Sequence, residues 1–92
     1  MIRSFKDADT KDLYETGCSQ RWAGIQTVAL RKLDQIEASA NLSSLRAPQG
    51  NRLEPPKRER IGQHSIRINN QCRICFVWKE DGAHEVEITD YH

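Results

Sequence analysis

Residues 63–78 read QHSIRINNQCRICFVW, and this stretch decides the fold. Apolar and polar residues alternate on both sides of Asn69-Asn70, a pair that is typical of a tight turn. The apolar positions are Ile66 and Ile68, then Ile74, Phe76 and Trp78. Because successive side chains of a strand point to opposite faces, each apolar set lies on one face. The pattern predicts a β-hairpin that begins near Gln63 and buries one face.

The same alternation continues to the end of the chain and is also present at its start. Glu80-Asp81-Gly82 is typical of a second turn. After it, Val86 and Ile88 should point inward, with Glu85 and Glu87 toward solvent. At the other end, Ile2 to Phe5 is short and apolar-alternating, which suits an initial strand. We therefore expect three or four strands in a mainly antiparallel sheet.

Two helices are predicted between the initial strand and the hairpin. A short helix begins near Asp9 or Thr10, either of which can cap its first turn, and ends at Gly17. From Ala23 to Ala40 the apolar residues recur every three or four positions, the period of an amphipathic helix. A connection follows from Asn41 to Asn51, with a turn of helix around Leu42 to Leu45. The predicted class is α+β, with the initial strand and two helices packed on one face of the sheet.

Length and composition favour one small globular domain that spans residues 1–92. Hydrophobic residues make up 37% and charged residues 29% of the 92 residues, which is short of the disordered regime. No apolar run approaches the roughly 20 residues of a membrane span, and MIRSFKDADT at the start is unlike a secretory signal. We expect a cytoplasmic protein with no membrane partner.

Charge is distributed unevenly along the chain, although the formal net charge is only +1. Residues 1–40 are neutral overall. Residues 41–79 carry eight Lys/Arg against two Glu, and residues 80–92 carry five acidic residues and no basic one. A basic central block can bind a phosphate backbone by releasing condensed counterions. The alternative, a solvated charged surface, is about equally common in small proteins.

The sheet face away from the helices should carry arginines. Its residues, of opposite parity to the apolar set, are Ser65, Arg67, Asn69, Arg73, Cys75 and Val77. The preceding loop, residues 52–60, is polar and interrupted by Pro55-Pro56, so it should overhang this face. The face and the loop together form the predicted functional surface.

The cysteines do not predict a metal site or a cofactor site. Cys72 and Cys75 form a C-x-x-C, but positions three apart in a strand point to opposite faces, so their thiols cannot converge on one metal. His64, His84 and His92 are scattered and supply no second ligand pair. We expect no metal, no cofactor and no disulfide, with Cys18 also a free thiol.

The chain ends in Asp90-Tyr91-His92, which combines a carboxylate, an aromatic ring and an imidazole. A terminal His is most often a frayed side chain. Beside a basic face, however, these groups are the parts needed to cleave RNA through its own 2′-hydroxyl without a metal. A base removes the hydroxyl proton, cations stabilise the phosphate, and an acid protonates the leaving oxygen.

Several stretches together resemble one known family. They are MIRSFK at residues 1–6, GNRLEP at 50–55, GQHSIRIN at 62–69, RICFVW at 73–78 and the terminal Asp90-Tyr91-His92. In this order, and over essentially the whole chain, they resemble the HigB toxins of bacterial toxin–antitoxin pairs, within the RelE-like superfamily.

The resemblance implies a ribosome-dependent mRNA endonuclease that enters the decoding site and cuts the message there. Its partner would be a HigA-like helix-turn-helix antitoxin, through which alone it would meet operator DNA. Matched by position, His92 and Asp90 would transfer protons, Arg73 and Lys57 would stabilise the phosphate, and Tyr91 would stack on or position a base. Further RNA contacts would come from the basic region, at Arg52, Arg58, Arg60 and Arg67.

Two positions depart from the family pattern, and one other class of function stays open. Glu54 stands where family members often carry His, so it could act as a base or pair with Arg52 or Lys57. Cys72 stands where Trp is common, and by parity it belongs to the core. The alternative function is a non-catalytic module that binds nucleic acid or the antitoxin and acts in transcriptional autoregulation.

Overall fold

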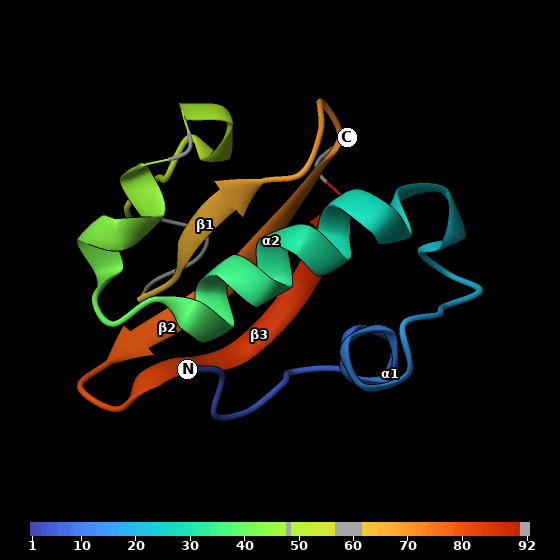
Figure 1. Ribbon diagram of the computed structural model, residues 1–92, viewed down its shortest axis with the longest axis horizontal. Coiled ribbons are helices and arrows are strands. Elements are labelled where there is room, and N and C mark those ends of the chain that lie inside the picture. Colours follow the sequence, from blue (N-terminus) through green and yellow to red (C-terminus); the bar gives the residue numbers. More distant parts are fainter. Residues whose placement is uncertain (48, 57–61, 91–92) are drawn as a thin grey trace.

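The computed structural model describes residues 1–47, 49–56 and 62–90, which form an α+β fold. A three-stranded antiparallel sheet in the order β1-β2-β3 carries both α-helices on one face (Figure 1). The elements, in chain order, are α1 (Ala8–Thr16), the 3-10 helix η1 (Ala23–Ile25), α2 (Gln26–Ala38), the 3-10 helices η2 (Leu42–Arg46) and η3 (Gln49–Asn51), β1 (His64–Arg67), β2 (Cys72–Lys79) and β3 (Gly82–Asp90). The predicted fold class is confirmed.

Helix α1 is capped by Asp7, two residues before the first predicted capping position. The Asp7 carboxylate accepts a hydrogen bond from the Thr10 backbone N–H at 3.1 Å, which satisfies one free donor of the first turn. Asp9 and Thr10 lie inside the helix instead, so that part of the prediction was wrong. Gly17 ends the helix as predicted, with φ at 81° and its N–H bonded to the Leu13 carbonyl.

Helix α2 is shorter than the predicted Ala23–Ala40. Residues Ala23–Ile25 form a 3-10 turn, and the α-helix begins at Gln26 and ends at Ala38. No side chain caps the start of either element, and Gly24 favours flexible backbone over α-helix. The apolar period was correct, because Ala29, Leu33 and Ile36 are fully buried against the sheet.

The hairpin turns at Asn69-Asn70, as predicted. Ile66 pairs with Ile74, and Arg67 pairs with Arg73. The Asn69 side-chain oxygen accepts hydrogen bonds from the backbone N–H groups of Gln71 (2.8 Å) and Cys72 (2.7 Å), so this one side chain shapes the turn. The β2–β3 pairing contains an irregularity between Cys75 and Val77.

The N-terminal segment pairs with β3 in parallel but forms two isolated bridges, Ile2 to Ala83 and Phe5 to Val86, in place of the predicted strand. The interruption lies where β3 is irregular, because Glu85 between these bridges has φ at 51°, outside the extended region. Backbone hydrogen bonds of 2.7–3.0 Å on either side of this interruption keep the segment on the sheet, including Arg3 N–H to the Ala83 carbonyl at 2.7 Å.

The core lies between the sheet and the two helices. Its largest fully buried side chains include Phe76, Leu13, Leu33 and Ile74. Cys72 belongs to this core cluster, as its parity predicted, whereas Cys75 is buried outside the cluster. Within the described parts of the chain, no helix is both long enough and apolar enough to cross a membrane.

Candidate functional site

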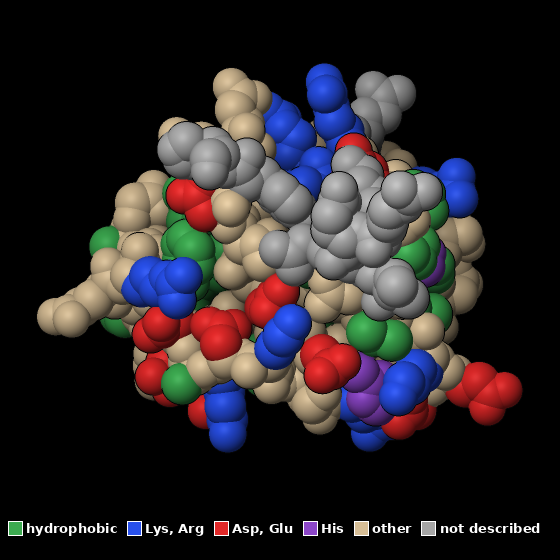
Figure 2. Space-filling view, turned by 180° about the vertical axis from the view of Figure 1, so that it is seen from behind, with side chains coloured by type: hydrophobic (Ala, Val, Ile, Leu, Met, Phe, Trp, Pro, Cys, Tyr) green, Lys and Arg blue, Asp and Glu red, His purple; other side chains and the backbone are tan. Residues whose placement is uncertain are grey.

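A cleft of about 400 Å³ opens beside the β1–β2 turn. Its lining is polar and mostly cationic or amide: Arg52, Glu54, Arg67, Asn69, Asn70, Gln71 and Arg73. Four of these residues, the three arginines and Glu54, were predicted as site residues. Figure 2 shows the face turned away from α2, where several Lys and Arg side chains lie along the upper edge and others lie along the left and lower edges. The tertiary fold thus brings residues that are up to 21 positions apart in the sequence into one cleft.

Arg73 is the most firmly held cation of the cleft. Its Nε donates to the Ser65 hydroxyl at 2.8 Å, and its Nη2 donates to the backbone carbonyls of Arg52 at 2.6 Å and Ser65 at 3.2 Å. Its side chain is only 13% exposed. Among the described residues, no acceptor is bonded to Nη1, so one end of the planar guanidinium is anchored and the other carries donors for a ligand.

Arg67 and Arg73 lie directly opposite each other on adjacent strands. Two like charges at paired positions repel each other when no anion lies between them. The Arg67 guanidinium is also oriented, because it donates to the side-chain oxygen of Asn70 in the turn. A phosphate group bound in the cleft would relieve this repulsion and accept hydrogen bonds from both arginines.

Glu54 supplies the acidic group of the cleft. Its carboxylate lies 3.9 Å from Nη2 of Arg73, a long and partly exposed ion pair. Its backbone pairs with Ser65 through two hydrogen bonds of 2.9 and 3.1 Å, which hold the loop that carries Glu54 against β1. The structure therefore places a carboxylate beside the anchored guanidinium, where it can accept a proton or balance charge.

Asp90 lies at the end of β3, directly after the residue that pairs with Arg73 across the strands. Thr89 is the cross-strand partner of Arg73, whereas Asp90 is the partner of Cys72, a core residue. Burial raises the pKa of the Cys72 thiol, and the Asp90 carboxylate raises it further. By strand parity, the carboxylate of Asp90 therefore belongs to the opposite side of the sheet from the Arg73 side chain.

The remaining predicted site residues lie outside the described residues. They are Lys57, Arg58 and Arg60 in the loop, and Tyr91 and His92 at the end of the chain. Their roles stay predictions.

The sequence analysis missed several groups that shape the site. Ser65 and Cys75 were expected on an open face, but both are buried, and Ser65 acts as an acceptor for Arg73. The turn amides, from Asn69 to Gln71, line the cleft. The hairpin register could have indicated Ser65, because it places Ser65 two cross-strand pairs from Arg73 and therefore on the same face; the carbonyl of Arg52 had no comparable signal.

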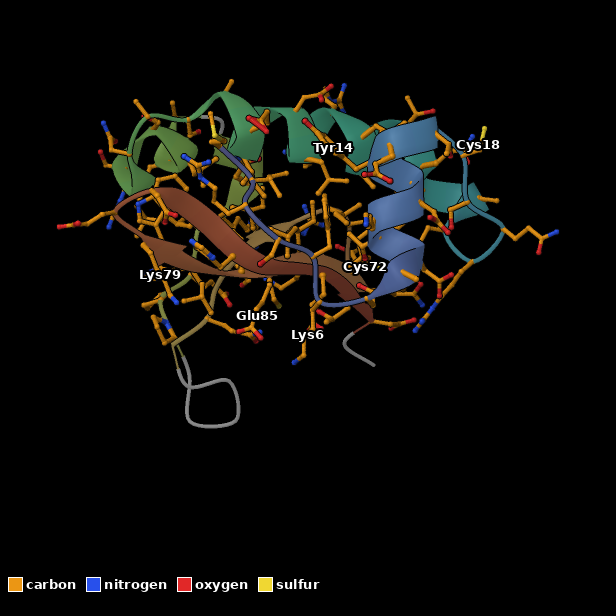
Figure 3. All side chains as sticks on the ribbon, turned by 90° about the horizontal axis from the view of Figure 1, so that it is seen from below. Lys6, Tyr14, Cys18, Cys72, Lys79 and Glu85 are labelled. Atoms are coloured by element: carbon orange, nitrogen blue, oxygen red, sulfur yellow. The ribbon has the colours of Figure 1, made fainter. Side chains whose placement is uncertain are left out.

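Other charged side chains extend along the sheet face away from the helices. Figure 3 shows Lys6, Lys79 and Glu85 on that side, with Tyr14 and Cys18 among the helices on the other. Lys6 pairs with Glu87 at 3.7 Å, and only 13% of the Glu87 side chain is exposed. Glu87 was predicted to point to solvent, and it is instead largely covered and ion-paired. Charges of both signs therefore lie along this face, and the cleft contributes three arginines and one glutamate to it.

Comparison with known proteins identifies the family. Residues 3–92 match a family described as RelE-like toxin of type II toxin–antitoxin system HigB. The chain is 36% identical over 85 residues to Toxin HigB-1 of Vibrio cholerae serotype O1, which covers 90% of each chain. It is also 42% identical over 59 residues to an uncharacterised protein of Haemophilus influenzae, covering 62% of this chain and 54% of that one. With an α+β fold and a cationic cleft, this chain belongs to the HigB family of RelE-like toxins of type II toxin–antitoxin systems.

Proposed function

We propose that this toxin is a ribosome-dependent endoribonuclease that cuts mRNA in the decoding site and thereby stops translation. The observation that carries the proposal is the opposed pair Arg67 and Arg73 in one cleft, with the Arg73 guanidinium anchored by Ser65 and Arg52. Cations that are oriented before the substrate arrives stabilise a charged transition state without reorganisation. Membership of the HigB family supports the same function.

The chemistry needs no group beyond the RNA and the protein. The 2′-oxygen of the RNA loses its proton to a base and bonds to the adjacent phosphorus, and the bond from phosphorus to the 5′-oxygen breaks. An acid then protonates the leaving 5′-oxygen, which produces a 2′,3′-cyclic phosphate and a 5′-hydroxyl. Arg73 would bind the phosphate oxygens, whose negative charge increases in the transition state.

The groups that move protons are assigned to the end of the chain. We assign His92 and Asp90 to proton transfer, and Tyr91 to stacking on or positioning a base. Because strand parity places the Asp90 carboxylate on the opposite side of the sheet from Arg73, Asp90 would act by orienting His92, and His92 would be the group that meets the RNA. Lys57 would add a second cation at the phosphate, and Arg52, Arg58, Arg60 and Arg67 would bind the RNA on either side. Glu54 supplies a second candidate base, since its carboxylate lies 3.9 Å from Arg73.

Dependence on the ribosome follows from the size of the site. A cleft of about 400 Å³ contacts only a few nucleotides, so the protein by itself has little surface with which to select or hold a message. The decoding site would hold the mRNA in place and supply the remaining contacts. We therefore expect weak or no cleavage of free RNA.

A toxin of a type II system has an antitoxin protein as its partner. We propose a HigA-like antitoxin with a helix-turn-helix fold, which would bind operator DNA and carry the toxin to it. The compartment that follows from this function is the cytoplasm, where ribosomes translate the message.

The proposal is tested with programmed ribosomes that hold an mRNA in the decoding site. Arg73→Ala should lower the single-turnover cleavage rate by roughly a hundredfold to a thousandfold, because it removes a transition-state donor. Binding to the ribosome, measured by pelleting, should change much less. Arg31→Ala is the matched control, since Arg31 is an exposed cation in α2 that does not line the cleft, and its loss should leave cleavage unchanged.

Absence of cleavage by folded, antitoxin-free wild-type protein on these ribosomes would defeat the proposal. A non-catalytic binding module is the other outcome, and deletion of Asp90 to His92 distinguishes the two. An endonuclease loses cleavage and growth arrest on this deletion, whereas a module keeps its function because it keeps its affinity.

A further inference from the structure

A buried polar network joins α2 to the segment that leads into the cleft. The centre of the network is Asn51, whose side chain is fully buried. Its amide nitrogen donates to the Gln35 side chain at 3.0 Å and to the Leu45 carbonyl at 3.1 Å. Its oxygen accepts a hydrogen bond from the amine of Lys32, a residue that is only 8% exposed. Both amide N–H groups and the amide oxygen of Asn51 are therefore occupied.

Burying this polar network costs free energy, because its amine and amide groups are removed from water. Burial lowers the pKa of Lys32, and the neighbouring cations Arg31 and Arg67 lower it further. A buried amine and a buried amide contribute little net stability compared with apolar side chains of similar size, but they accept only one arrangement. Such a network is suited to holding the segment that contains Asn51 in one position relative to the sheet.

The residue next to Asn51 contacts the anchored guanidinium. Arg52 has φ at 44°, in the left-handed region, so the chain turns sharply directly after Asn51. Its carbonyl then accepts a hydrogen bond of 2.6 Å from Nη2 of Arg73. Two residues later, the backbone of Glu54 pairs with Ser65, which holds the other side of Arg73. The position of the Arg52 carbonyl therefore depends on where the buried amide of Asn51 is held.

We propose that Asn51 is a positioning residue for Arg73: held by Lys32 and Gln35 of α2, it aims the Arg52 carbonyl that orients the guanidinium. The effect on cleavage rests on the proposed function, because Arg73 stabilises the transition state only if the protein cuts RNA. The effect of Asn51 on the orientation of the Arg73 guanidinium does not rest on the proposed function.

The cleavage arm of the test is a double-mutant cycle. Asn51→Ala should lower the single-turnover rate on programmed ribosomes by roughly tenfold to a hundredfold, because small misplacement of a catalytic group has effects of this size. Ribosome binding should be nearly unchanged. In an Arg73→Ala background, Asn51→Ala should change the rate by less than about twofold, because the group that it positions is absent.

Thr10→Val is the matched control for a buried polar group elsewhere. The Thr10 side chain is fully buried, and its hydroxyl accepts a hydrogen bond of 3.1 Å from the Ile88 N–H, with no contact to Arg73. Any loss of rate that it causes should be the same with or without Arg73. If Asn51→Ala also lowered the rate by the same factor with and without Arg73, the proposal would be overturned.

The second arm uses NMR of the free protein to measure how fast the Arg73 guanidinium exchanges its Nε–H proton with solvent. The Arg73 Nε–H group donates to Ser65 at 2.8 Å, so its exchange with solvent should be slow in the wild type and several-fold faster in Asn51→Ala. Gln35→Ala removes one of the bonds to Asn51 and should show a smaller increase. If Asn51→Ala fails to fold, Gln35→Ala alone provides the test.

Unchanged exchange in folded variants would overturn the positioning role. Wild-type protein that cuts no message would defeat the proposed function, and in that case the NMR arm would still decide whether Asn51 orients Arg73.

Discussion

At the scale of single residues, His64 shows how burial sets the charge state of a group outside the cleft. Burial lowers its pKa, and the cation Arg46 lowers it further. Its Nδ1 is buried with no hydrogen-bond partner among the described residues, and its ring stacks on Phe76 at 6.4 Å between centroids. The neutral imidazole therefore fits the native structure better than the charged form does.

This environment predicts a loss of stability in mild acid. The unfolded chain binds a proton at His64 near its ordinary pKa of about 6.5, whereas the native state resists protonation, so the contribution of His64 is present above that pH and is lost as pH falls toward the folded pKa. Tm should fall between about pH 7.5 and about pH 5.5, a window above most carboxylate titrations. His64→Phe, which keeps an aromatic ring beside Phe76, should show a smaller fall in thermal denaturation.

The control is His84→Gln, which changes a surface histidine that pairs with Asp81. It should keep the part of the pH dependence that belongs to His64. An equal fall in Tm for wild type and His64→Phe would show that His64 does not contribute.

At the scale of elements, the start of β3 is joined to the N-terminal segment at Gly82. Gly82 has φ at 129°, and a Cβ there would overlap the carbonyl group of Met1. The Met1 carbonyl accepts a hydrogen bond of 2.8 Å from Ala83 N–H at this point. Only glycine allows this approach, so one residue determines whether the N-terminal segment can join the sheet.

Gly82→Ala should therefore lower the free energy of unfolding by about 2–4 kcal/mol, through backbone strain and the overlap with Met1. Gly24→Ala is the comparison, because no atom of the described parts of the chain would contact a Cβ within 4 Å at that position, and its effect should be within about 0.5 kcal/mol of zero. Urea denaturation measures both. Similar losses for the two variants would show that the close approach to Met1 does not matter.

At the scale of the whole molecule, the net charge of +1 does not describe the local charge that a ligand in the cleft would contact. Acidic side chains such as Glu87 and Asp81 are paired with cations on the surface, whereas Arg52, Arg67 and Arg73 share one cleft. A phosphate backbone bound there interacts with a local positive field and releases counterions.

Binding to single-stranded RNA or to ribosomes should consequently weaken as salt rises, despite the nearly neutral chain. Arg67→Gln should reduce the slope of log K against log salt by about 0.7 for single-stranded RNA, the value for one lost phosphate contact. Arg31→Gln, on the helix side, should leave the slope unchanged. Fluorescence anisotropy over a salt series checks this, and a slope that is the same for wild type and Arg67→Gln would rule out a phosphate contact by Arg67.

Much of the fold could be predicted from local pattern. Alternation predicted the strands of the hairpin, and the apolar period predicted α2, because each pattern states which face of an element is buried. The ends of the helices were less well predicted. Asp7, Asp9 and Thr10 are all chemically suitable caps, and their backbone conformation determines which one acts.

The sequence by itself determined the α+β class, the hairpin with its turn and the separation of Cys72 from Cys75, because these depend on periodicities of two and 3.6 along a short stretch of chain. Only the tertiary structure decided that Arg73 is anchored by the Arg52 carbonyl and by Ser65, and that Asn51 is tied to α2. These contacts join residues 8 to 21 positions apart through backbone carbonyls and buried amides. Every residue has a carbonyl, so composition and spacing carry no signal for which one a guanidinium will bind.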